Sequence, residues 1–317
     1  MQFLQTAATL LFLLNFCRSQ QQLPNFDISN EEIVRLVNEM RAADSNKARP
    51  GQIQLDYQGH TGSADSEDRA QKPLFKNIDS SLLRKPTYEA LLKLQDNFER
   101  QTGVAEVNTA EEAGEVDNFL TLILNTQPWS VLGKFLKSKG HPFAQDKATM
   151  KRWLNQLWFE QYSRARGQKD TSGFEHIFIG ESKNGEVSGL HNWLRFYILE
   201  RASSVDYKGF LVKRGVSCKS VGIIKSVFSH CWEQLDSIGE IFLKSSGTIL
   251  IGTSPEFEMA LYLLCFLSRR GRNTCDFELD GCPMQITSYD IRQNRNVFIG
   301  SAFPSAGRMT GACRANA

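Results

Sequence analysis

The sequence predicts an α+β protein in which a helical first half precedes a second half of strands with interleaved helices. Apolar residues of the first half recur at helical spacing behind capping signals, whereas β-prone runs and a hairpin signal follow in the second half. The 317 residues are enough for one large domain or two lobes. A content of 41% hydrophobic and 23% charged residues is typical of a globular chain and excludes a disordered or fibrous one.

The helices of the first half are marked by the residues that begin them. Ser29 with Glu32 and Thr109 with Glu112 have the spacing of capping boxes, and Pro86 is typical of a first helical position. The apolar residues of these helices and of a further one recur every three or four positions: Ile33, Leu36, Val37, Met40; Leu91, Leu92, Leu94, Phe98; Val116, Phe119, Leu120, Ile123; Met150, Trp153, Leu154, Leu157, Trp158. The polar stretch from Ala48 to Lys72 lacks this pattern and is predicted to be a long surface loop.

The second half contains the strand signals. The run from Phe174 to Glu181 is β-prone, and the Asn184-Gly185 pair behind it predicts a hairpin turn. Ser254 and Pro255 have the residue types of a helix cap and a first helical position. Further strands are predicted at two places: Gly247–Gly252 and Val297–Gly300.

The N-terminal residues are expected to direct the chain out of the cell. The apolar stretch from Ala7 to Phe16 has the length of a signal-peptide core and is too short to span a bilayer, so residues 1–20 are interpreted as a signal peptide. The alternative is an apolar N-terminal helix packed on the body. No later apolar run is long enough for a membrane helix, and we therefore expect a secreted, soluble protein without membrane insertion.

Charge and cysteine content narrow the function classes only in part. Lys and Arg number 37 against 35 Asp and Glu, so the chain lacks the basic excess of a protein that grips a long duplex, although a small nuclease site does not need one. Six cysteines follow Cys17, an even number that suggests disulfides in an exported chain. No CxxC pair occurs and the histidines are not at zinc-ligand spacing, so a structural zinc site is not expected.

Two of the five histidines flank the predicted hairpin. His176 is expected on its first strand and His191 at the start of the helix that follows, so strand pairing would bring the two imidazoles close together. RNA cleavage by acid–base catalysis needs one group that takes the proton of the ribose 2′-hydroxyl and one that protonates the departing 5′-oxygen. Histidine suits both tasks because its ordinary pKa of about 6.5 lies near neutrality. A cation such as Lys244 would stabilise the phosphorane. The alternative is that both histidines are structural.

Several separated blocks then resemble the poly(U)-specific endoribonucleases of the EndoU (XendoU-like) family. The blocks are Ser172–Glu181, Ser188–Trp193, Lys244–Thr248, Ile251–Glu258 and, in the first half, Ala43–Lys47, Pro73–Phe75, Lys85–Tyr88 and Asn97–Gly103. They occur in the family's order and extend from about Ile28 to Pro304. The resemblance implies an EndoU-like domain over 28–310, with a mainly helical lobe at 28–165 and a catalytic lobe of two antiparallel β-sheets with flanking helices at 166–310.

The resemblance also implies a role for individual residues. His191 matches the family's general base, His176 its general acid and Lys244 its third catalytic residue. Gly189 is similar to a position whose backbone N–H donates to a phosphate oxygen, and Thr248 to one that contacts uracil. Glu175 and Glu181 match acidic residues that serve metal dependence or orient the site; the alternative is that both lie on the surface of a strand.

Two further expectations depend on this resemblance. Phe303 stands where the family usually has a tyrosine that stacks on uracil, so uridine preference or rate is expected to differ, and Tyr289 matches another family tyrosine unless it is a core residue. The resemblance favours a Cys265–Cys275 disulfide. Proximity and elimination then leave Cys218–Cys231 and Cys282–Cys313.

The expected activity is cleavage of single-stranded RNA at uridylates, giving 2′,3′-cyclic phosphate and 5′-hydroxyl ends. DNA lacks the attacking 2′-hydroxyl and is not expected to be a substrate. The resemblance implies assistance by Mn²⁺ or Ca²⁺, although the sequence contains no tight ligand cluster. The alternatives are an RNA-binding protein with weak catalysis and a secreted interaction protein on the same fold. No GxSxG motif supports a serine hydrolase.

Overall fold

The computed structural model describes residues 23–62, 67–165, 167–184, 186–214, 222–232, 240–271, 274–308, 310–311 and 313. For residues 214, 222–223, 225–232 and 240–245 it describes the backbone but not the side chains. The predicted signal peptide, Cys218 and the side chain of Lys244 therefore lie outside the described parts. Among the described helices, none has both the length and the apolar character needed to cross a membrane.

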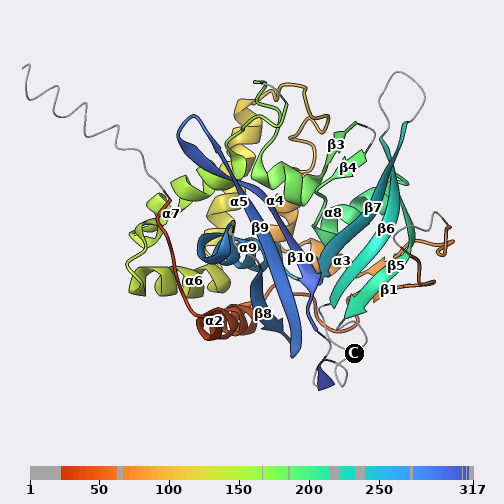
Figure 1. Cartoon of the computed structure of the whole chain (residues 1–317), viewed down its shortest axis with the longest axis horizontal. Coiled ribbons are helices and arrows are strands. Elements are labelled where there is room, and N and C mark those ends of the chain that lie inside the picture. The colour runs from red at the N-terminus through yellow and green to blue at the C-terminus, as the bar shows by residue number, and fades with distance from the viewer. Residues whose placement is uncertain are drawn as a thin grey trace, which may run out of the picture.

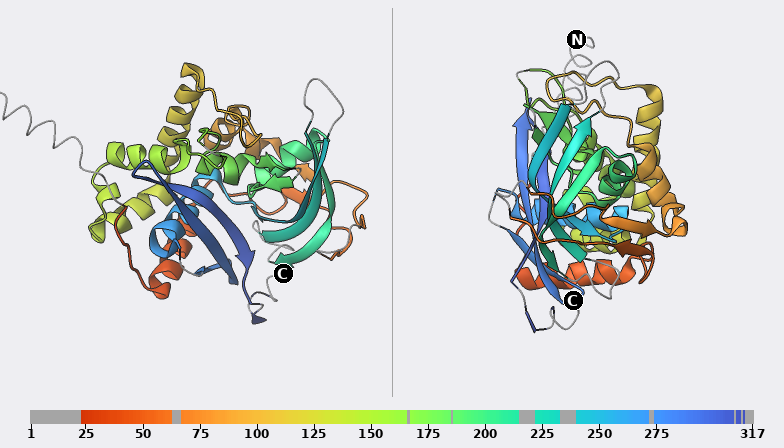
Figure 2. Two further views of the ribbon diagram at one scale, coloured as in Figure 1. Left: turned by 45° about the horizontal axis from the view of Figure 1, so that its top comes forward. Right: turned by 90° about the vertical axis from the view of Figure 1, so that its right-hand side faces the viewer.

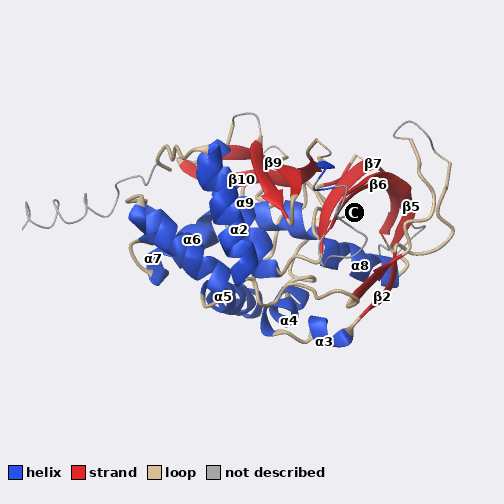
Figure 3. Cartoon of the chain, turned by 90° about the horizontal axis from the view of Figure 1, so that it is seen from below, coloured by secondary structure: helices blue, strands red, loops and turns tan. Residues whose placement is uncertain are grey.

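Helices dominate the chain up to Phe159, and most gather on one side of the molecule (Figures 1 and 3). The predicted capping boxes at Ser29 and Thr109 are both formed, and Pro86 opens a helix as expected. The helical segments of this part are α2 (Asn30–Ala43), α3 (Ser80–Leu83), α4 (Pro86–Lys93), α5 (Ala110–Leu124), α6 (Gln127–Ser138), η1 (Pro142–Ala144), α7 (Lys147–Leu154) and η2 (Asn155–Phe159). Later in the chain come η3 (Glu175–Ile179), α8 (Trp193–Arg201) and α9 (Pro255–Arg269).

The described strands form three sheets, so the α+β class is confirmed. A three-stranded antiparallel sheet has the order β10-β9-β8, and a five-stranded sheet has the order β3-β4-β7-β6-β5, in which only the β4–β7 join is parallel. The strands are β1 (Ile53–Leu55), β2 (Phe75–Ile78), β3 (Glu181–Lys183), β4 (Glu186–Ser188), β5 (Val205–Arg214), β6 (Gly222–Trp232), β7 (Glu240–Ile251), β8 (Cys275–Leu279), β9 (Cys282–Gln293) and β10 (Asn296–Ala306). β10 lies beside β7, so the two larger sheets meet along these strands (Figure 2).

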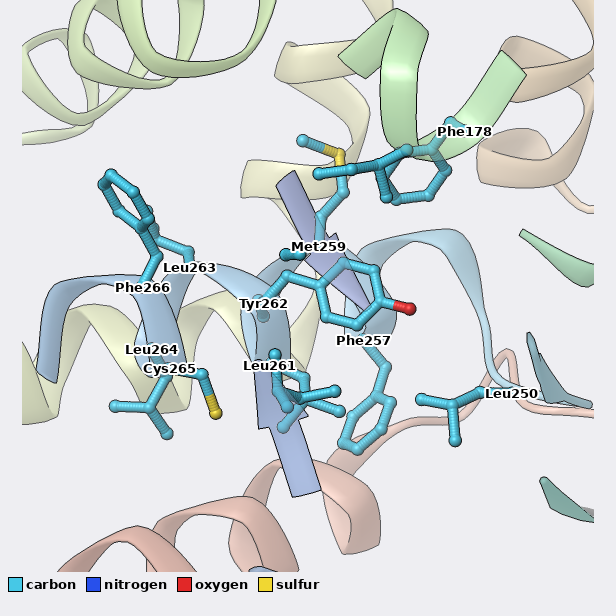
Figure 4. Packing of buried hydrophobic residues seen from close by; sticks show 14 of the residues in the cluster. Phe178, Leu250, Phe257, Met259, Leu261, Tyr262, Leu263, Leu264, Cys265 and Phe266 are labelled. Carbon is cyan, nitrogen blue, oxygen red and sulfur yellow. The ribbon is translucent and has the colours of Figure 1, made fainter. Parts of the chain in front are cut away.

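The core is centred on α9. Every residue of this helix from Pro255 to Ser268 is buried, because α9 packs between the helices α2, α4, α5 and α6 and the sheet β8–β10. Its side chains point to all sides, and Tyr262 meets Phe178 of η3 with ring centroids 6.2 Å apart (Figure 4). Ser254 caps the helix by accepting from the backbone N–H of Phe257, as the sequence predicts.

Two sequence predictions are wrong in part. The run Phe174–Glu181 was expected to be a strand, but Glu175–Ile179 is a π-helical turn and the strand begins only at Glu181. All five residues of this turn are buried, and a buried apolar run has the same sequence pattern in a helix as in a strand. The stretch Ala48–Lys72 is not wholly a loop, because β1 lies within it and pairs with β2.

The cysteines agree with the expected pairing where the structure describes them. Cys265 is bonded to Cys275, which joins α9 to β8. Cys282 is bonded to Cys313, which joins the start of β9 to the segment after β10. The pair Cys218–Cys231 stays a prediction because Cys218 lies outside the described residues.

Candidate active site

The two hairpin-flanking histidines are brought together by backbone hydrogen bonds. His176 lies in the η3 turn, the β3–β4 hairpin follows, and His191 comes just before α8. The backbone N–H of Leu190 donates to the carbonyl of His176 over 3.0 Å, and the N–H of His191 donates to that of Ile177 over 2.7 Å. The imidazole centroids lie 6.5 Å apart. The prediction that the hairpin juxtaposes these rings is therefore right, although the first ring is carried by a helical turn.

Gly189 makes this close approach possible. Its φ of +71° lies in the left-handed region that favours glycine. A Cβ atom built at this position would lie 1.7 Å from the carbonyl oxygen of His176, which is far inside van der Waals contact. Any side chain here would push the His191 segment away from the His176 segment.

A buried carboxylate orients His176. Oε2 of Glu181 lies 2.8 Å from Nδ1 of His176, and the Glu181 side chain is 2% exposed. Its other oxygen accepts from the hydroxyl of Thr171 and forms an ion pair with Arg164. Burial alone would raise the pKa of Glu181, but His176, Arg164 and Thr171 together hold it below its usual value. Glu181 is thus an ionised group that fixes the orientation of the ring, and it is not a surface residue.

His191 is held by backbone rather than by a carboxylate. Its Nδ1 lies 3.1 Å from the carbonyl oxygen of Thr248 in β7. The following residue, Asn192, caps α8 by accepting from the N–H of Arg195 and donates to Glu258 of α9 over 3.2 Å. The position of His191 is therefore set by three elements: the hairpin, β7 and α9.

Both imidazoles line a pocket of about 560 Å³ between β10 and β7. Phe303 lies against His191, with ring centroids 5.4 Å apart and planes at 31°. Tyr289 lies 6.5 Å from Phe303 and is 53% exposed, so it is not a core residue. The pocket is lined by His176, His191, Val212, Ser246, Thr248, Ser301, Phe303, Pro304, Ser305 and Ala306.

Lys244 is placed only through its backbone. It lies in β7, opposite Phe228 of β6 and four residues before Thr248. Its side chain lies outside the described atoms, so its catalytic role stays a prediction. Gly189 is close to the pocket through its contact with His176 but does not line it.

Glu175 is buried beneath the site and is not on a strand surface. Burial, with the carboxyl groups of Glu181 and Glu106 nearby, raises the pKa of Glu175 well above its usual range. Burial likewise raises the pKa of Glu106 to about 7. The surroundings of Glu175 therefore disfavour its ionised form.

Glu175 and Glu181 can be tested as ligands for the expected Mn²⁺ or Ca²⁺ ion. Both oxygens of Glu181 already have protein partners, and the surroundings of Glu175 disfavour the ionised form that a ligand for Mn²⁺ or Ca²⁺ needs. In the part of the chain that the structure describes, no group of three His, Cys, Asp or Glu side chains could hold a metal ion. Glu175 and Glu181 thus do not fit a metal centre, and we assign no step to an ion bound there.

Comparison with known proteins identifies the family. The family model described as "Endoribonuclease XendoU" matches residues 32–304. The chain belongs to the XendoU endoribonuclease family. It is 36% identical to the poly(U)-specific endoribonuclease-B of Xenopus laevis over 87% of this chain and 94% of that one. It is 37% identical to the uridylate-specific endoribonuclease of Bos taurus over 83% of this chain, but spans only 61% of that longer protein.

A solved structure agrees with the family assignment. The chain resembles the solved structure of XendoU, a splicing-independent snoRNA processing endoribonuclease, with a TM-score of 0.72 and 34% identity. The match covers 89% of this chain and 99% of the other. The α+β fold and the membership in the XendoU family are therefore both shown.

Several residues of this XendoU-family site were not predicted from the sequence. Arg164 and Thr171 act on His176 through Glu181, and no local pattern marks them. Asn192 lies in a recognised block, but its contact with Glu258 of α9 joins segments far apart in the sequence. Ser246 and Ser301 line the pocket. Their positions, two residues from Thr248 and Phe303 in strands where alternate residues share a face, were the signal that could have found them.

Proposed function

We propose that the chain is an endoribonuclease that cleaves single-stranded RNA on the 3′ side of uridylates. The observation that supports this best is the pair of imidazoles 6.5 Å apart in one pocket, with an aromatic ring against one of them. Two histidines at this separation can act on opposite sides of one phosphate. The names of the relatives, which specify uridylate or poly(U), support the base preference.

In the proposed reaction His191 takes the proton of the 2′-hydroxyl while the 2′-oxygen attacks the neighbouring phosphorus. The bond from phosphorus to the 5′-oxygen breaks, and His176 gives its proton to that oxygen. The products are a 2′,3′-cyclic phosphate and a 5′-hydroxyl. Glu181 holds the His176 ring through Nδ1, which assigns the proton transfer to the opposite nitrogen, Nε2.

The remaining catalytic groups stabilise negative charge. Lys244 is proposed to contact the non-bridging oxygens of the phosphorane, where a cation stabilises the transition state more than the bound substrate. The backbone N–H of Gly189 is proposed to donate a hydrogen bond to a phosphate oxygen. Both assignments follow from the family resemblance.

The base is proposed to lie on Phe303. A phenyl ring stacks on a nucleobase without the hydroxyl that the family's tyrosine offers. Thr248, which lines the same pocket as Phe303, is the proposed hydrogen-bonding group for uracil. Tyr289, exposed beside Phe303, is proposed to contact a neighbouring part of the RNA.

Secretion and metal dependence are further parts of the proposal. Residues 1–20 are proposed to be removed as a signal peptide, which the N-terminal sequence of protein collected from culture medium would test. Dependence on Mn²⁺ or Ca²⁺ is proposed from the resemblance, with the ion bound away from Glu175 and Glu181.

The test is cleavage of an oligonucleotide with one uridine among adenosines, in Mn²⁺, in Ca²⁺ and with a chelator. We expect a single cut after the uridine in the presence of an ion, with cyclic phosphate and 5′-hydroxyl ends identified by mass spectrometry. Cuts spread over the adenosines would contradict the base assignment. Products with 5′-phosphate ends would contradict the mechanism.

A further inference from the structure

A second pocket of about 1000 Å³ lies at the tip of the β9–β10 hairpin. Its walls come from α5, from the segment around Gln161–Lys169 and from the hairpin itself. Amide side chains are frequent in this lining: Asn97, Asn108, Asn155, Gln161, Gln293, Asn294 and Asn296. Apart from Arg164, which supports His176 through Glu181, no residue of this lining has a part in the proposed reaction.

The register of the hairpin places this pocket and the catalytic pocket on one face of the sheet. In the catalytic pocket, Ser301 lies opposite Tyr289 and Phe303 lies opposite Thr287. Toward the tip, β10 residues 298 and 296 lie opposite β9 residues 291 and 293. Alternate residues of a strand point to the same face, so the odd-numbered residues 287–293 of β9 share one face of the sheet. Their partners in β10 (residues 303, 301, 298 and 296) lie on that same face.

An irregularity in β10 allows the two pockets to lie on one face of the sheet. Phe298 and Phe303 are five residues apart and would point to opposite faces of a regular strand. The register shift between Ile299 and Ser301 reverses the alternation of side chains from there on, so both rings lie on the same side of the sheet. Five strand residues span about 16 Å, a distance that a few nucleotides of single-stranded RNA can cover. Tyr289 stands exposed on this face, between the two pockets.

Hydrogen bonds connect the segments that line the tip pocket. The amide of Gln293 donates to the carbonyl of Ser163 over 2.6 Å and accepts from its N–H over 2.9 Å. Asn108 and Gln161 exchange two hydrogen bonds of 3.1 Å. A pocket held in this way costs little further ordering when a ligand binds.

The chemistry of the lining favours a base over a phosphate. Arg164 and Lys169 are offset by Glu112 and Glu160, and Arg164 already forms an ion pair with Glu181, so the pocket has no excess of positive charge. Amide side chains offer both donors and acceptors to the edge of a splayed-out base. Nδ2 of Asn97 is buried and has no hydrogen-bond partner among the described atoms.

We propose that this tip pocket is a distal subsite for a base of the same single-stranded RNA, a few nucleotides from the cleaved uridine. The proposal rests on the proposed endoribonuclease function. The strand would run along β9 and β10, from Phe303 past the exposed Tyr289 to Asn294.

Equilibrium binding of non-cleavable RNA tests the subsite apart from catalysis. The probes carry a 2′-O-methyl uridine, either as a dinucleotide or extended by adenosines on its 5′ or its 3′ side, and are followed by fluorescence anisotropy. Ala113→Trp fills the pocket from the exposed surface of α5, and Asn294→Gly removes an amide while keeping the left-handed turn. Glu111→Trp, on the same helix, is the control for Ala113→Trp. Asn184→Gly, the same substitution at a similar positive φ in the β3–β4 hairpin, is the control for Asn294→Gly.

One of the two extended probes is expected to bind about tenfold more tightly than the dinucleotide. Ala113→Trp and Asn294→Gly should remove most of that gain without changing dinucleotide binding, and the two controls should keep it. Equal binding of long and short probes, or a gain that survives both pocket variants, would overturn the proposal. Cleavage of a ribose dinucleotide by the same variants reports separately on the proposed function, because that substrate does not reach the tip.

Discussion

The reactivity of the site depends on how each histidine is oriented. His176 faces a buried, ionised carboxylate, whereas His191 faces a backbone carbonyl. The charge of Glu181 is stabilised by Arg164 and Thr171, so a chain of polar contacts runs from the 160–171 segment to the imidazole. The two rings therefore have unlike environments, which suits a reaction that needs one acid and one base.

Replacing Glu181 with Gln should lower kcat with little effect on KM. The amide keeps the size of the side chain but removes the charge that orients His176, so we expect kcat to fall by about a hundredfold. Steady-state kinetics on a uridine dinucleotide would measure this. Glu186→Gln, an exposed change on the same hairpin, is the control, and an unchanged kcat for Glu181→Gln would remove the carboxylate from the mechanism.

Gly189→Ala should cost both stability and activity. The new methyl group would clash with the carbonyl of His176, and the positive φ would add strain, for an expected loss of about 2–4 kcal/mol in the free energy of unfolding. Gly114→Ala in α5 is the matched control, since its Cβ meets nothing and helix propensity should stabilise it by about 0.5–1 kcal/mol. Urea unfolding separates the two. Equal stability of both variants would contradict the account of Gly189.

Phe303→Tyr should sharpen the preference for uridine. The ring already lies against His191 at a stacking distance, and the added hydroxyl supplies the hydrogen-bonding group that the family's tyrosine has. Competition between uridine and cytidine dinucleotides measures the ratio of their kcat/KM values. No change in this ratio, together with an unchanged ratio for Phe303→Ala, would mean that this ring is not the base platform.

The candidate site could be predicted from the sequence only where its residues lie in recognisable blocks. His176, His191, Thr248 and Phe303 were found in this way, and the structure gathers all four around one pocket. Arg164 could not be found, because its ion pair with Glu181 joins segments that no local pattern connects. Tyr289 was left open between core and surface, and its exposure follows from the face of β9 on which it lies, opposite to that of the buried Ser288.

At the scale of elements, α9 connects the core to the site. Glu258 in its first turn is fully buried and accepts hydrogen bonds from Asn192, Thr253 and Tyr262. Burial raises the pKa of Glu258 to about 8, so it is largely protonated at neutral pH. Through Asn192 this carboxyl also supports the residue next to His191.

Stability should fall as the pH rises through the pKa of Glu258. A carboxyl whose pKa is raised on folding binds more protons in the folded state, so its contribution is complete below the unfolded pKa and is lost toward the folded value. Glu258 alone contributes a slope of at most about 1.4 kcal/mol per pH unit between roughly pH 5 and 8. Urea unfolding across this range measures it. Glu258→Gln should flatten the slope, and an unchanged slope would contradict the burial argument.

The elements that the sequence predicted best are those with capping residues. Ser29, Thr109 and Ser254 each begin a helix where expected, because their side chains satisfy backbone N–H groups locally. The η3 turn was mistaken for a strand because its residues are buried on all sides and show no period. Its end at Gly180, with a φ of +89°, is the local signal that remained.

At the scale of the whole molecule, the candidate active site lies where two sheets meet. β10 and β7 are more than forty residues apart in the chain, and their approach depends on α9, which packs against β9 and β10 from the core. The sequence indicated the α+β class but not the sheet order or the bulge in β10. These features come from long-range packing and not from local propensity.

The most direct test of the account is the effect of a single 2′-oxygen. Two oligonucleotides are compared that differ only in having ribose or 2′-deoxyribose at their one uridine. If His191 removes the 2′-proton and His176 protonates the leaving oxygen, the ribose substrate is cut after the uridine and the deoxy substrate stays intact over the same time. Cutting of both at similar rates would contradict the mechanism on which the site assignment depends.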